Sequence, residues 1–198
     1  MDLTSPRTIR NIQEQFGFTF KKGLGQNFLT ARNILEEIVD AAEIESGVIE
    51  VGPGFGVLTS ELAQNSDKVV TIEIDERLID VLDYTLAEYD NVKIINEDIL
   101  KLDLKKVIDD EFNGEKVSIA ANLPYYITTP IITKLLEEKL PIKNIVVMVQ
   151  KEVAERMSAK PSTKDYGAIT VLCQYYTEPS IVANVPASLF VPPPRWTV

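Results

Sequence analysis

The chain has 198 residues, 45% of them hydrophobic and 25% charged, which fits one globular domain that buries its own core. Its net charge of −10 argues against a protein that coats nucleic acid through bulk electrostatics. A single cysteine and no histidine exclude an internal disulfide and a Cys/His metal site, so we expect a cytoplasmic protein without a metal. No apolar run approaches the roughly 18 residues of a membrane span, and no membrane association is expected.

The start of the chain is positively charged, whereas the chain as a whole is negative. Residues 1–26 hold two acidic residues and four basic ones, which are Arg7, Arg10, Lys21 and Lys22. An ordinary solvated terminus would have the same composition. The alternative is a local basic patch on an otherwise acidic protein.

From about residue 30 onward, short apolar runs alternate with longer amphipathic ones. The short runs are rich in valine and isoleucine, which is typical of buried strands. We expect five strands, at residues 48–51, 69–73, 92–95, 117–121 and 145–149. The last run is apolar throughout, which predicts that it is covered on both faces. With helices between the strands, the pattern predicts a doubly wound, mostly parallel α/β sheet.

Four helices are expected around these strands. They begin after Thr30, pass through residues 58–62 and 78–86, and open at Thr129-Pro130. Thr30 is the predicted N-cap of the first, because its hydroxyl can accept from a backbone amide. Pro130 is expected at the first helical position, where proline loses no needed hydrogen bond. The polar segment up to Asp110 is predicted to be looser.

Ligands of such sheets bind beyond the carboxyl ends of the strands, so the residues that follow each strand are the candidates. The first strand is followed by Gly52-Pro53-Gly54-Phe55-Gly56, where missing side chains let a ligand approach the backbone. The same turn occurs in dinucleotide enzymes, but their third glycine would be at position 57, which is Val57. The pyrophosphate fingerprint is therefore imperfect, and glycines that only turn the chain remain an alternative.

Acidic residues follow the second and third strands. Glu73 lies 21 residues after Gly52, close to the spacing at which an acid accepts from ribose hydroxyls. Asp98 is placed to accept from an adenine amine, although each acid alone could be a solvated loop charge. Together they specify an adenosine without phosphates, which fits S-adenosylmethionine at least as well as NAD. An acidic edge also suits an ammonium and a sulfonium, so we favour S-adenosylmethionine as the cofactor.

Asn122-Leu123-Pro124-Tyr125 follows the fourth strand, next to the expected position of the donor's methyl group. An adenine amine is a poor nucleophile because its lone pair is delocalised into the ring. The side-chain oxygen of Asn122 and a main-chain carbonyl of Leu123 or Pro124 could accept both amine hydrogens and aim the lone pair at the sulfonium. Pro124 would fix the turn and Tyr125 would stack on an extruded base, whereas Tyr126 is expected only to pack.

Five short motifs occur in a set order along the chain. They are Gly25-Gln26-Asn27-Phe28-Leu29, Glu50-Val51-Gly52-Pro53-Gly54, Glu73-Ile74-Asp75, Asn122-Leu123-Pro124-Tyr125-Tyr126 and the segment 150–156, QKEVAER. Together they resemble the ribosomal RNA adenine dimethyltransferases of the KsgA type, from about residue 20 to residue 194. The resemblance implies a Rossmann-like class I S-adenosylmethionine-dependent methyltransferase fold. It also implies dimethylation at N6 of two adjacent adenosines in a hairpin loop near the 3′ end of small-subunit (16S) rRNA, linked to maturation of the small subunit.

The resemblance also assigns site residues, motif by motif. The implied cofactor pocket consists of Gln26, Asn27, Leu29, Gly52, Gly54, Glu73, Asp98 and Asn122. The implied catalytic residues around the target adenine are Asn122, Leu123, Pro124, Tyr125 and Phe190. Phe190 stands in a Phe-x-Pro-x-Pro segment and is similar to the family's aromatic residue near the transferred methyl. The basic residues Arg7, Arg10, Lys21 and Lys22 become candidate RNA contacts.

Two departures from the family concern the end of the chain. The family continues with a last strand, antiparallel at the sheet edge, and then a small helical domain, whereas this sequence reads Arg195-Trp196-Thr197-Val198. We therefore expect an N-terminal arm at 1–29 that closes the cofactor and RNA site, followed by a catalytic domain at 30–198. In that domain the last strand is truncated and the helical domain is absent. An exposed sheet edge can promote self-association, but the expected working form is a monomer bound to small-subunit rRNA or the immature 30S-type subunit.

Three other functions fit parts of the sequence. Large-subunit rRNA adenine N6-methyltransferases of the macrolide-resistance type share the Gln-Asn-Phe and Asn-x-Pro-Tyr signatures, but they tend to be basic and this chain has a net charge of −10. The chain could instead be a binding factor for ribosome assembly, with methylation incidental. A dinucleotide oxidoreductase is the third of these functions.

Overall fold

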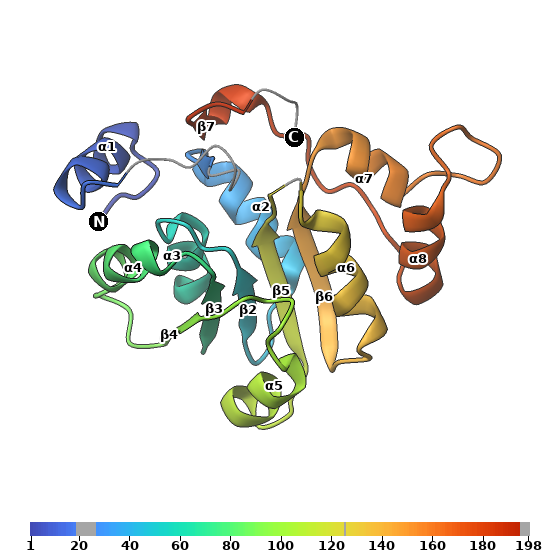
Figure 1. Ribbon diagram of the computed structural model, residues 1–198, viewed down its shortest axis with the longest axis horizontal. Coiled ribbons are helices and arrows are strands. Elements are labelled where there is room, and N and C mark those ends of the chain that lie inside the picture. Colours follow the sequence, from blue (N-terminus) through green and yellow to red (C-terminus); the bar gives the residue numbers. More distant parts are fainter. Residues whose placement is uncertain (19–26, 125, 195–198) are drawn as a thin grey trace.

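The computed structural model describes residues 1–18, 27–124 and 126–194. Its centre is a sheet of five parallel strands in the order β4-β3-β2-β5-β6. The strands are β2 (Val48–Val51), β3 (Val69–Glu73), β4 (Val92–Asn96), β5 (Val117–Asn122) and β6 (Ile142–Met148). All five predicted strands are present, and the predicted doubly wound parallel sheet is confirmed (Figure 1).

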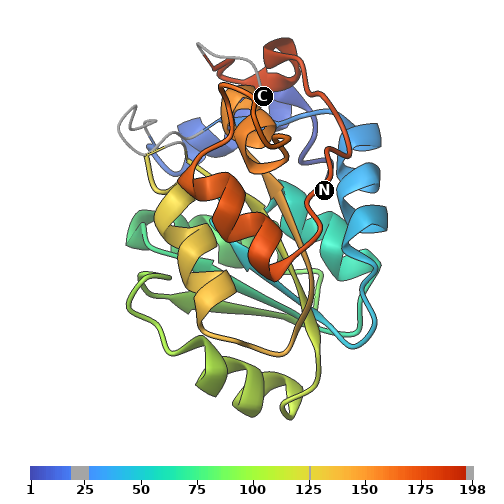
Figure 2. The same ribbon diagram turned by 90° about the vertical axis from the view of Figure 1, so that its right-hand side faces the viewer.

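Helices cover both faces of this sheet (Figure 2). The helices whose buried side chains join the core on one face are α1 (Pro6–Gln15), α2 (Arg32–Ala42), α3 (Val57–Gln64) and α4 (Ile79–Thr85), the last preceded by the 3₁₀ turn η2 (Glu76–Leu78). The helices of the other face are α5 (Leu104–Phe112), α6 (Thr128–Glu137), α7 (Lys151–Met157) and α8 (Ala168–Tyr176). Two separate hydrophobic clusters result, one on each side of the sheet.

The register of the strands aligns the carboxyl ends of β2, β3 and β5, where a ligand site is expected. Val51 pairs with Ile72 on one side and with Ala121 on the other. The next residues, Gly52, Glu73 and Asn122, therefore lie level with one another at the carboxyl edge. The strand order also reverses between β2 and β5, and such a switch point opens a crevice for a ligand.

A second, two-stranded sheet lies across this edge and joins distant parts of the chain. Strand β1 (Phe28–Leu29) pairs antiparallel with β7 (Phe190–Val191), which follows the 3₁₀ turn η3 (Ala187–Leu189). The carbonyl of Leu189 accepts from both the backbone amide and the hydroxyl of Thr30, each at 2.8 Å. The prediction of Thr30 as an N-cap is therefore wrong: Ala31 is the N-cap of α2, because the hydroxyl of Thr30 bonds to a segment 159 residues away.

Three other predictions about elements need correction. The polar segment before Asp110 contains helix α5, whose N-cap Asp103 accepts from the amide of Lys106 at 3.0 Å. Pro130 is the third residue of α6, not the first, although it still lies in the first turn. The last predicted strand begins earlier, at Ile142, and most of its residues are half-buried, because β6 is at the edge of the sheet and its outer side has no strand partner among the described residues.

The outer edge of β6 has no strand partner among the residues that the structure describes. Beside it is a groove of about 680 Å³, lined on the far side by the extended segment 178–185. The resemblance places an antiparallel strand at this edge, and both that strand and self-association through the edge stay predictions.

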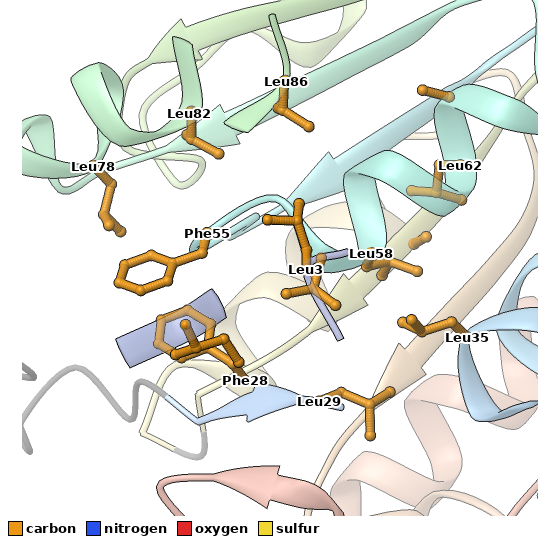
Figure 3. Close-up of a cluster of buried hydrophobic side chains, with 14 of the residues drawn as sticks. Leu3, Phe28, Leu29, Leu35, Phe55, Leu58, Leu62, Leu78, Leu82 and Leu86 are labelled. Carbon is orange, nitrogen blue, oxygen red and sulfur yellow. The ribbon is translucent and has the colours of Figure 1, made fainter. Parts of the chain in front are cut away.

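The N-terminal arm packs onto the same core as the rest of the molecule. Leu3, Ile9 and Ile12 are buried with side chains of α3 and α4. Phe28 stacks on Phe55 with 4.3 Å between the ring centroids, and Figure 3 shows the two rings facing each other. The described part of residues 1–29 is thus attached by apolar contacts to α3, to α4 and to the loop after β2.

Candidate functional site

The glycine turn after β2 forms the floor of a cavity at the carboxyl edge. Gly52 and Gly54 have φ values of +73° and +60°, which L side chains rarely adopt. A Cβ on Gly54 would lie 2.5 Å from Cε1 of Phe28, so the arm itself requires glycine here. A Cβ on Gly52 would meet nothing within 4 Å, so open space lies beside this residue. The turn therefore leaves its backbone accessible on the cavity side.

Glu73 is fixed against this turn by two backbone amides. Its Oε1 accepts from the amide of Asp75 at 2.8 Å and its Oε2 from the amide of Gly54 at 3.4 Å. Burial raises the pKa of this carboxyl, and the two amide hydrogen bonds oppose that shift by favouring the charged form. Because each carboxylate oxygen has two lone pairs, both oxygens can still accept from a ligand such as a vicinal diol.

Asp98 begins the turn after β4 and lines the same cavity. Its Oδ1 accepts from the amide of Leu100 at 3.0 Å, and its Oδ2 lies 3.8 Å from Nζ of Lys101. The side chain is thereby held at the rim, where an amine donor can reach it. Glu97 lines the cavity beside it and adds to the negative charge.

Glu50 is a buried acid of the site that the sequence reasoning missed. It lies inside β2, is 1% exposed, lines the cavity, and accepts from the hydroxyl of Thr59. Burial raises the pKa of Glu50 to about 8 against the effect of its hydrogen bonds, and the nearby Glu73 carboxyl adds to the rise. A charged residue in the otherwise apolar run Val48-Ile49-Glu50-Val51 is the signal that could have revealed it.

Asn122 is oriented by the N-terminal arm. Its Nδ2 donates to the main-chain carbonyl of Asn27 at 3.1 Å, a contact that spans 95 residues of sequence. An amide nitrogen only donates and an amide oxygen only accepts, so this bond fixes which end of the side chain is which. Oδ1 of Asn122 is then the atom left to accept a hydrogen from a ligand.

The backbone after Asn122 distinguishes between the two predicted carbonyl acceptors. The carbonyl of Pro124 already accepts from the amide of Ile127 at 3.2 Å and from the hydroxyl of Thr128 at 3.0 Å. A carbonyl oxygen has two lone pairs, so both are in use. Because the amide of Leu123 is bonded to the carbonyl of Met148 at 3.0 Å, the Leu123 peptide is held in place and its carbonyl becomes the better candidate.

Nine of the sequence-predicted site residues meet in this one cavity. They are Asn27, Leu29, Gly52, Gly54, Glu73, Asp98, Asn122, Leu123 and Pro124. Phe190 is not among the residues that line it: this side chain is 3% exposed and packs in the core, while its strand partner Leu29 lines the cavity. The place of Phe190 near a transferred methyl stays a prediction.

The remaining predicted residues lie elsewhere or outside the description. Gln26, Tyr125, Lys21 and Lys22 are outside the described residues. Arg7 and Arg10 are exposed on α1, and Nε of Arg10 donates to the carbonyl of Pro6. The expectation that Tyr126 only packs is wrong, because this ring is 47% exposed and lines the cavity.

Two kinds of feature are absent from the part of the chain that the structure describes. Among the described residues, no group of three or more acidic, cysteine or histidine side chains is arranged to hold a metal ion. No helix in residues 1–18, 27–124 and 126–194 has the length and apolarity to cross a bilayer.

The geometry agrees with proteins of similar sequence and structure. Small-subunit rRNA methyltransferases A of Bacillus mycoides strain KBAB4 and Bacillus cereus strain B4264 are each 55% identical over 197 residues, which is 98% of this chain and 68% of theirs. A dimethyladenosine transferase from Plasmodium falciparum superposes with a TM-score of 0.75 at 34% identity, over 86% of this chain and 60% of that one. The 23S rRNA methyltransferase ErmE superposes with a TM-score of 0.70 at 30% identity, over 86% of this chain and 66% of that one.

These structural likenesses confirm the predicted Rossmann-like class I methyltransferase fold. The family model described as ribosomal RNA adenine dimethylase matches residues 17–196. That match covers the end of the arm from residue 17, the glycine turn, the strand-end acids and the Asn122 segment together. The chain therefore belongs to the ribosomal RNA adenine dimethylase family, a family of rRNA methyltransferases, as its motifs predict.

Proposed function

We propose that this chain dimethylates N6 of two adjacent adenosines in a 3′-terminal hairpin loop of small-subunit rRNA, with S-adenosylmethionine as the methyl donor. The observation that carries the proposal is the orientation of Asn122. Its amide nitrogen is held by the carbonyl of Asn27, and its oxygen remains as an acceptor in the cavity that also contains the glycine turn and two strand-end acids. An adenine amine and an adenosine-containing donor fit these two halves.

The donor half of the cavity, formed by Gly52, Glu73 and Asp98, fits an adenosine with a positively charged group attached to it. Glu73 would accept from the ribose hydroxyls, Asp98 from the adenine amine, and the open side of Gly52 would let the ligand lie against the backbone. Leu29 and Asn27, with Gln26 beside them, would close this pocket from the arm. S-adenosylmethionine, when bound, supplies a methyl group on a sulfonium, and the acidic lining stabilises that cation.

The acceptor half would align the target amine. Oδ1 of Asn122 and the carbonyl of Leu123 would accept its two hydrogens, which favours a tetrahedral nitrogen with its lone pair aimed at the methyl carbon. As the N–C bond forms, the C–S bond breaks and its electrons stay on sulfur. The product amine then loses its proton to solvent, so no histidine is needed. We assign the stacking of the extruded base to Tyr125 and a place near the methyl group to Phe190.

The RNA partner would also contact the arm. We assign phosphate contacts to Arg7, Arg10, Lys21 and Lys22, and we propose a cytoplasmic enzyme that acts on the immature 30S-type subunit. One copy of the chain is sufficient in this proposal, because the nine predicted residues that the structure brings together all come from one chain.

The experiment that tests this proposal compares substrates. Purified immature small subunits and naked large-subunit RNA are each incubated with the chain and radiolabelled S-adenosylmethionine. We expect label in the small-subunit RNA alone. Label in the large-subunit RNA alone would instead identify the macrolide-resistance type of activity.

Two further measurements distinguish this methyltransferase from an oxidoreductase and from a binding factor for ribosome assembly. Calorimetry with S-adenosylmethionine and with NAD is expected to show binding of the first only; binding of NAD alone would indicate an oxidoreductase. Asn122→Ala is expected to slow methyl transfer by at least about a hundredfold. If that variant still bound subunits and fully supported their assembly, the binding role would be the main one.

A further inference from the structure

The segment that follows β6 carries basic side chains that the proposed site does not use. Arg156 is in the last turn of α7, and Lys160 and Lys164 are in the loop that leads to α8. All three are exposed, and none forms an ion pair with another described residue. Elsewhere, cations such as Lys68, Lys93 and Arg77 are paired with carboxylates. Other cations of the described residues, such as Arg32 and Lys139, are also without an ion pair, but here three of them fall within nine residues of a chain with 30 acidic and 20 basic residues.

This segment leaves the sheet beside the acceptor half of the cavity. Met148, the last residue of β6, pairs with Asn122, and its carbonyl accepts from the amide of Leu123 at 3.0 Å. Helix α7 begins three residues later, at Lys151, and its seven residues advance by about 10 Å. Figure 1 shows α7 and its following loop at the same end of the molecule as β1, β7 and α1, while α5 lies at the opposite end.

The loop after α7 is held in place by hydrogen bonds to α8. The buried hydroxyl of Thr170 donates to the carbonyl of Arg156, and Nε2 of Gln174 donates to the carbonyl of Ala159 at 2.8 Å. Within the loop, the hydroxyl of Thr163 donates to the carbonyl of Lys160 at 2.8 Å. The backbone below the three cations is therefore fixed, and only their long side chains need to be ordered by a ligand.

The charge of this segment contrasts with that of the donor half. Residues 73–98 contain nine acidic and two basic residues, whereas residues 151–166 contain four basic and three acidic ones. A polyanion that approaches the cavity is repelled from the side of β3 and β4 and meets free cations on the side of α7. Tyr166, in the same loop, is 38% exposed and offers an aromatic face to an unpaired base.

We propose that Arg156, Lys160 and Lys164 bind the phosphates of the rRNA strand next to the target adenosine, as a second RNA surface separate from the basic arm. This inference rests on the proposed function. Cations that contact phosphates position an RNA without reading its bases. The three side chains thereby set how firmly the strand is held while Asn122 acts on the amine.

The test is a triple variant, Arg156→Ala/Lys160→Ala/Lys164→Ala, assayed with a hairpin RNA that has two adjacent adenosines in its loop. We expect the RNA Kd to rise on the order of tenfold and the KM for RNA to rise with it, while kcat and the Kd for S-adenosylmethionine change by less than about twofold. The slope of log Kd against log salt should fall by about 2, since each lost phosphate contact on a single strand removes roughly 0.7.

Two control variants accompany this test. Arg156→Lys/Lys160→Arg/Lys164→Arg keeps the charge and should retain the wild-type slope. Lys105→Ala/Lys106→Ala/Lys116→Ala removes three cations on and after α5, at the opposite end of the molecule, and should leave RNA binding unchanged. If the α7 triple variant keeps wild-type Kd and slope while the wild type methylates the hairpin, the inference fails and the proposed function stands. If the wild type neither binds nor methylates RNA, the proposed function fails as well.

Discussion

The two halves of the carboxyl edge are built differently. On the donor half, Glu73 is bound to the amides of Gly54 and Asp75, and its own carbonyl accepts from Asn96 at 2.7 Å. On the acceptor half, Asn122 has a single hydrogen bond across to the arm, β6 is half-exposed, and α7 buries none of its residues. The donor is a small molecule of fixed shape, so its pocket can be built in advance. The acceptor is a macromolecule, so that side must stay open.

Asn122→Ala should show the largest difference between the two halves, because it should affect methyl transfer much more than donor binding. Loss of the oriented oxygen removes an acceptor that acts on the amine during transfer, and such losses reduce kcat by about 10²- to 10³-fold. The donor half keeps its hydrogen bonds, so we expect the Kd for S-adenosylmethionine to change only a few-fold. Single-turnover assays measure the rate of methyl transfer, and calorimetry measures the affinity for S-adenosylmethionine. Equal losses of rate and affinity would contradict the difference between the two halves.

Glu50→Gln tests the buried carboxyl of the donor half through pH. Folded Glu50 keeps its proton up to about pH 8, whereas an unfolded glutamic acid loses it near pH 4.3. The folded state therefore binds more protons than the unfolded state in this window. The contribution of Glu50 to the free energy of unfolding is fully present below the pKa of the unfolded state, and it is lost as pH rises to the pKa of the folded state. Between pH 5.5 and 8 the wild type should lose roughly 3 kcal/mol, from a slope of about 1.4 kcal/mol per unit.

Urea unfolding at the two pH values measures this loss. In Glu50→Gln the loss should largely disappear, because glutamine does not titrate. Glu137→Gln, at an exposed position of α6, is the matched control and should lose stability as the wild type does. A Glu50→Gln variant with the wild-type pH dependence would show that Glu50 is ionised in the folded protein.

Gly54→Ala should disturb the donor half through the arm. The new Cβ would lie 2.5 Å from the Phe28 ring at a φ of +60°, so both strain and a displaced ring are expected. We predict a loss of about 2 kcal/mol of stability and at least tenfold weaker binding of S-adenosylmethionine. Gly114→Ala, at a φ of +72° and with only ordinary contact to Asp109, should lose stability alone. Equal donor affinity in the two variants would count against the role of Gly54.

Thr30→Val should have the smallest effect. It removes the hydroxyl bond to the carbonyl of Leu189 but leaves the backbone bond to the same oxygen. We expect a loss of about 1 kcal/mol in stability and a modest fall in donor affinity, because β1 carries residues that close the pocket. Thr177→Val removes a similar bond, to the carbonyl of Cys173 at the end of α8, and should affect stability only.

The sequence predicted the sheet well because its strands carry a local signal. Runs such as Val69–Glu73 are apolar and β-branched, and all five became parallel strands. The rule that ligands bind beyond the carboxyl ends of strands then selected Gly52, Glu73, Asp98 and Asn122, which the structure brings into one cavity. Helix α5 was missed, although Asp103 and the apolar spacing of Leu104, Val107 and Ile108 indicate it.

What the sequence did not predict depends on contacts between distant residues. The hydroxyl of Thr30 suits an N-cap locally, but a carbonyl 159 residues away binds it instead. The exposure of β6 follows from the order of the strands, which the apolarity of a single run cannot report. The carbonyl of Asn27 orients Asn122 only because the arm crosses the edge of the sheet, where β1 pairs with β7 and Phe28 stacks on Phe55.

The most direct test of the proposed activity is to count the modified nucleotides. Immature small subunits that lack the modification are incubated with the chain and S-adenosylmethionine, and the RNA is digested and quantified by mass spectrometry. We predict two N6,N6-dimethyladenosines per subunit, both within one loop fragment near the 3′ end. Absence of dimethyladenosine from a folded chain that binds S-adenosylmethionine, or its presence in large-subunit RNA alone, would contradict the proposed activity.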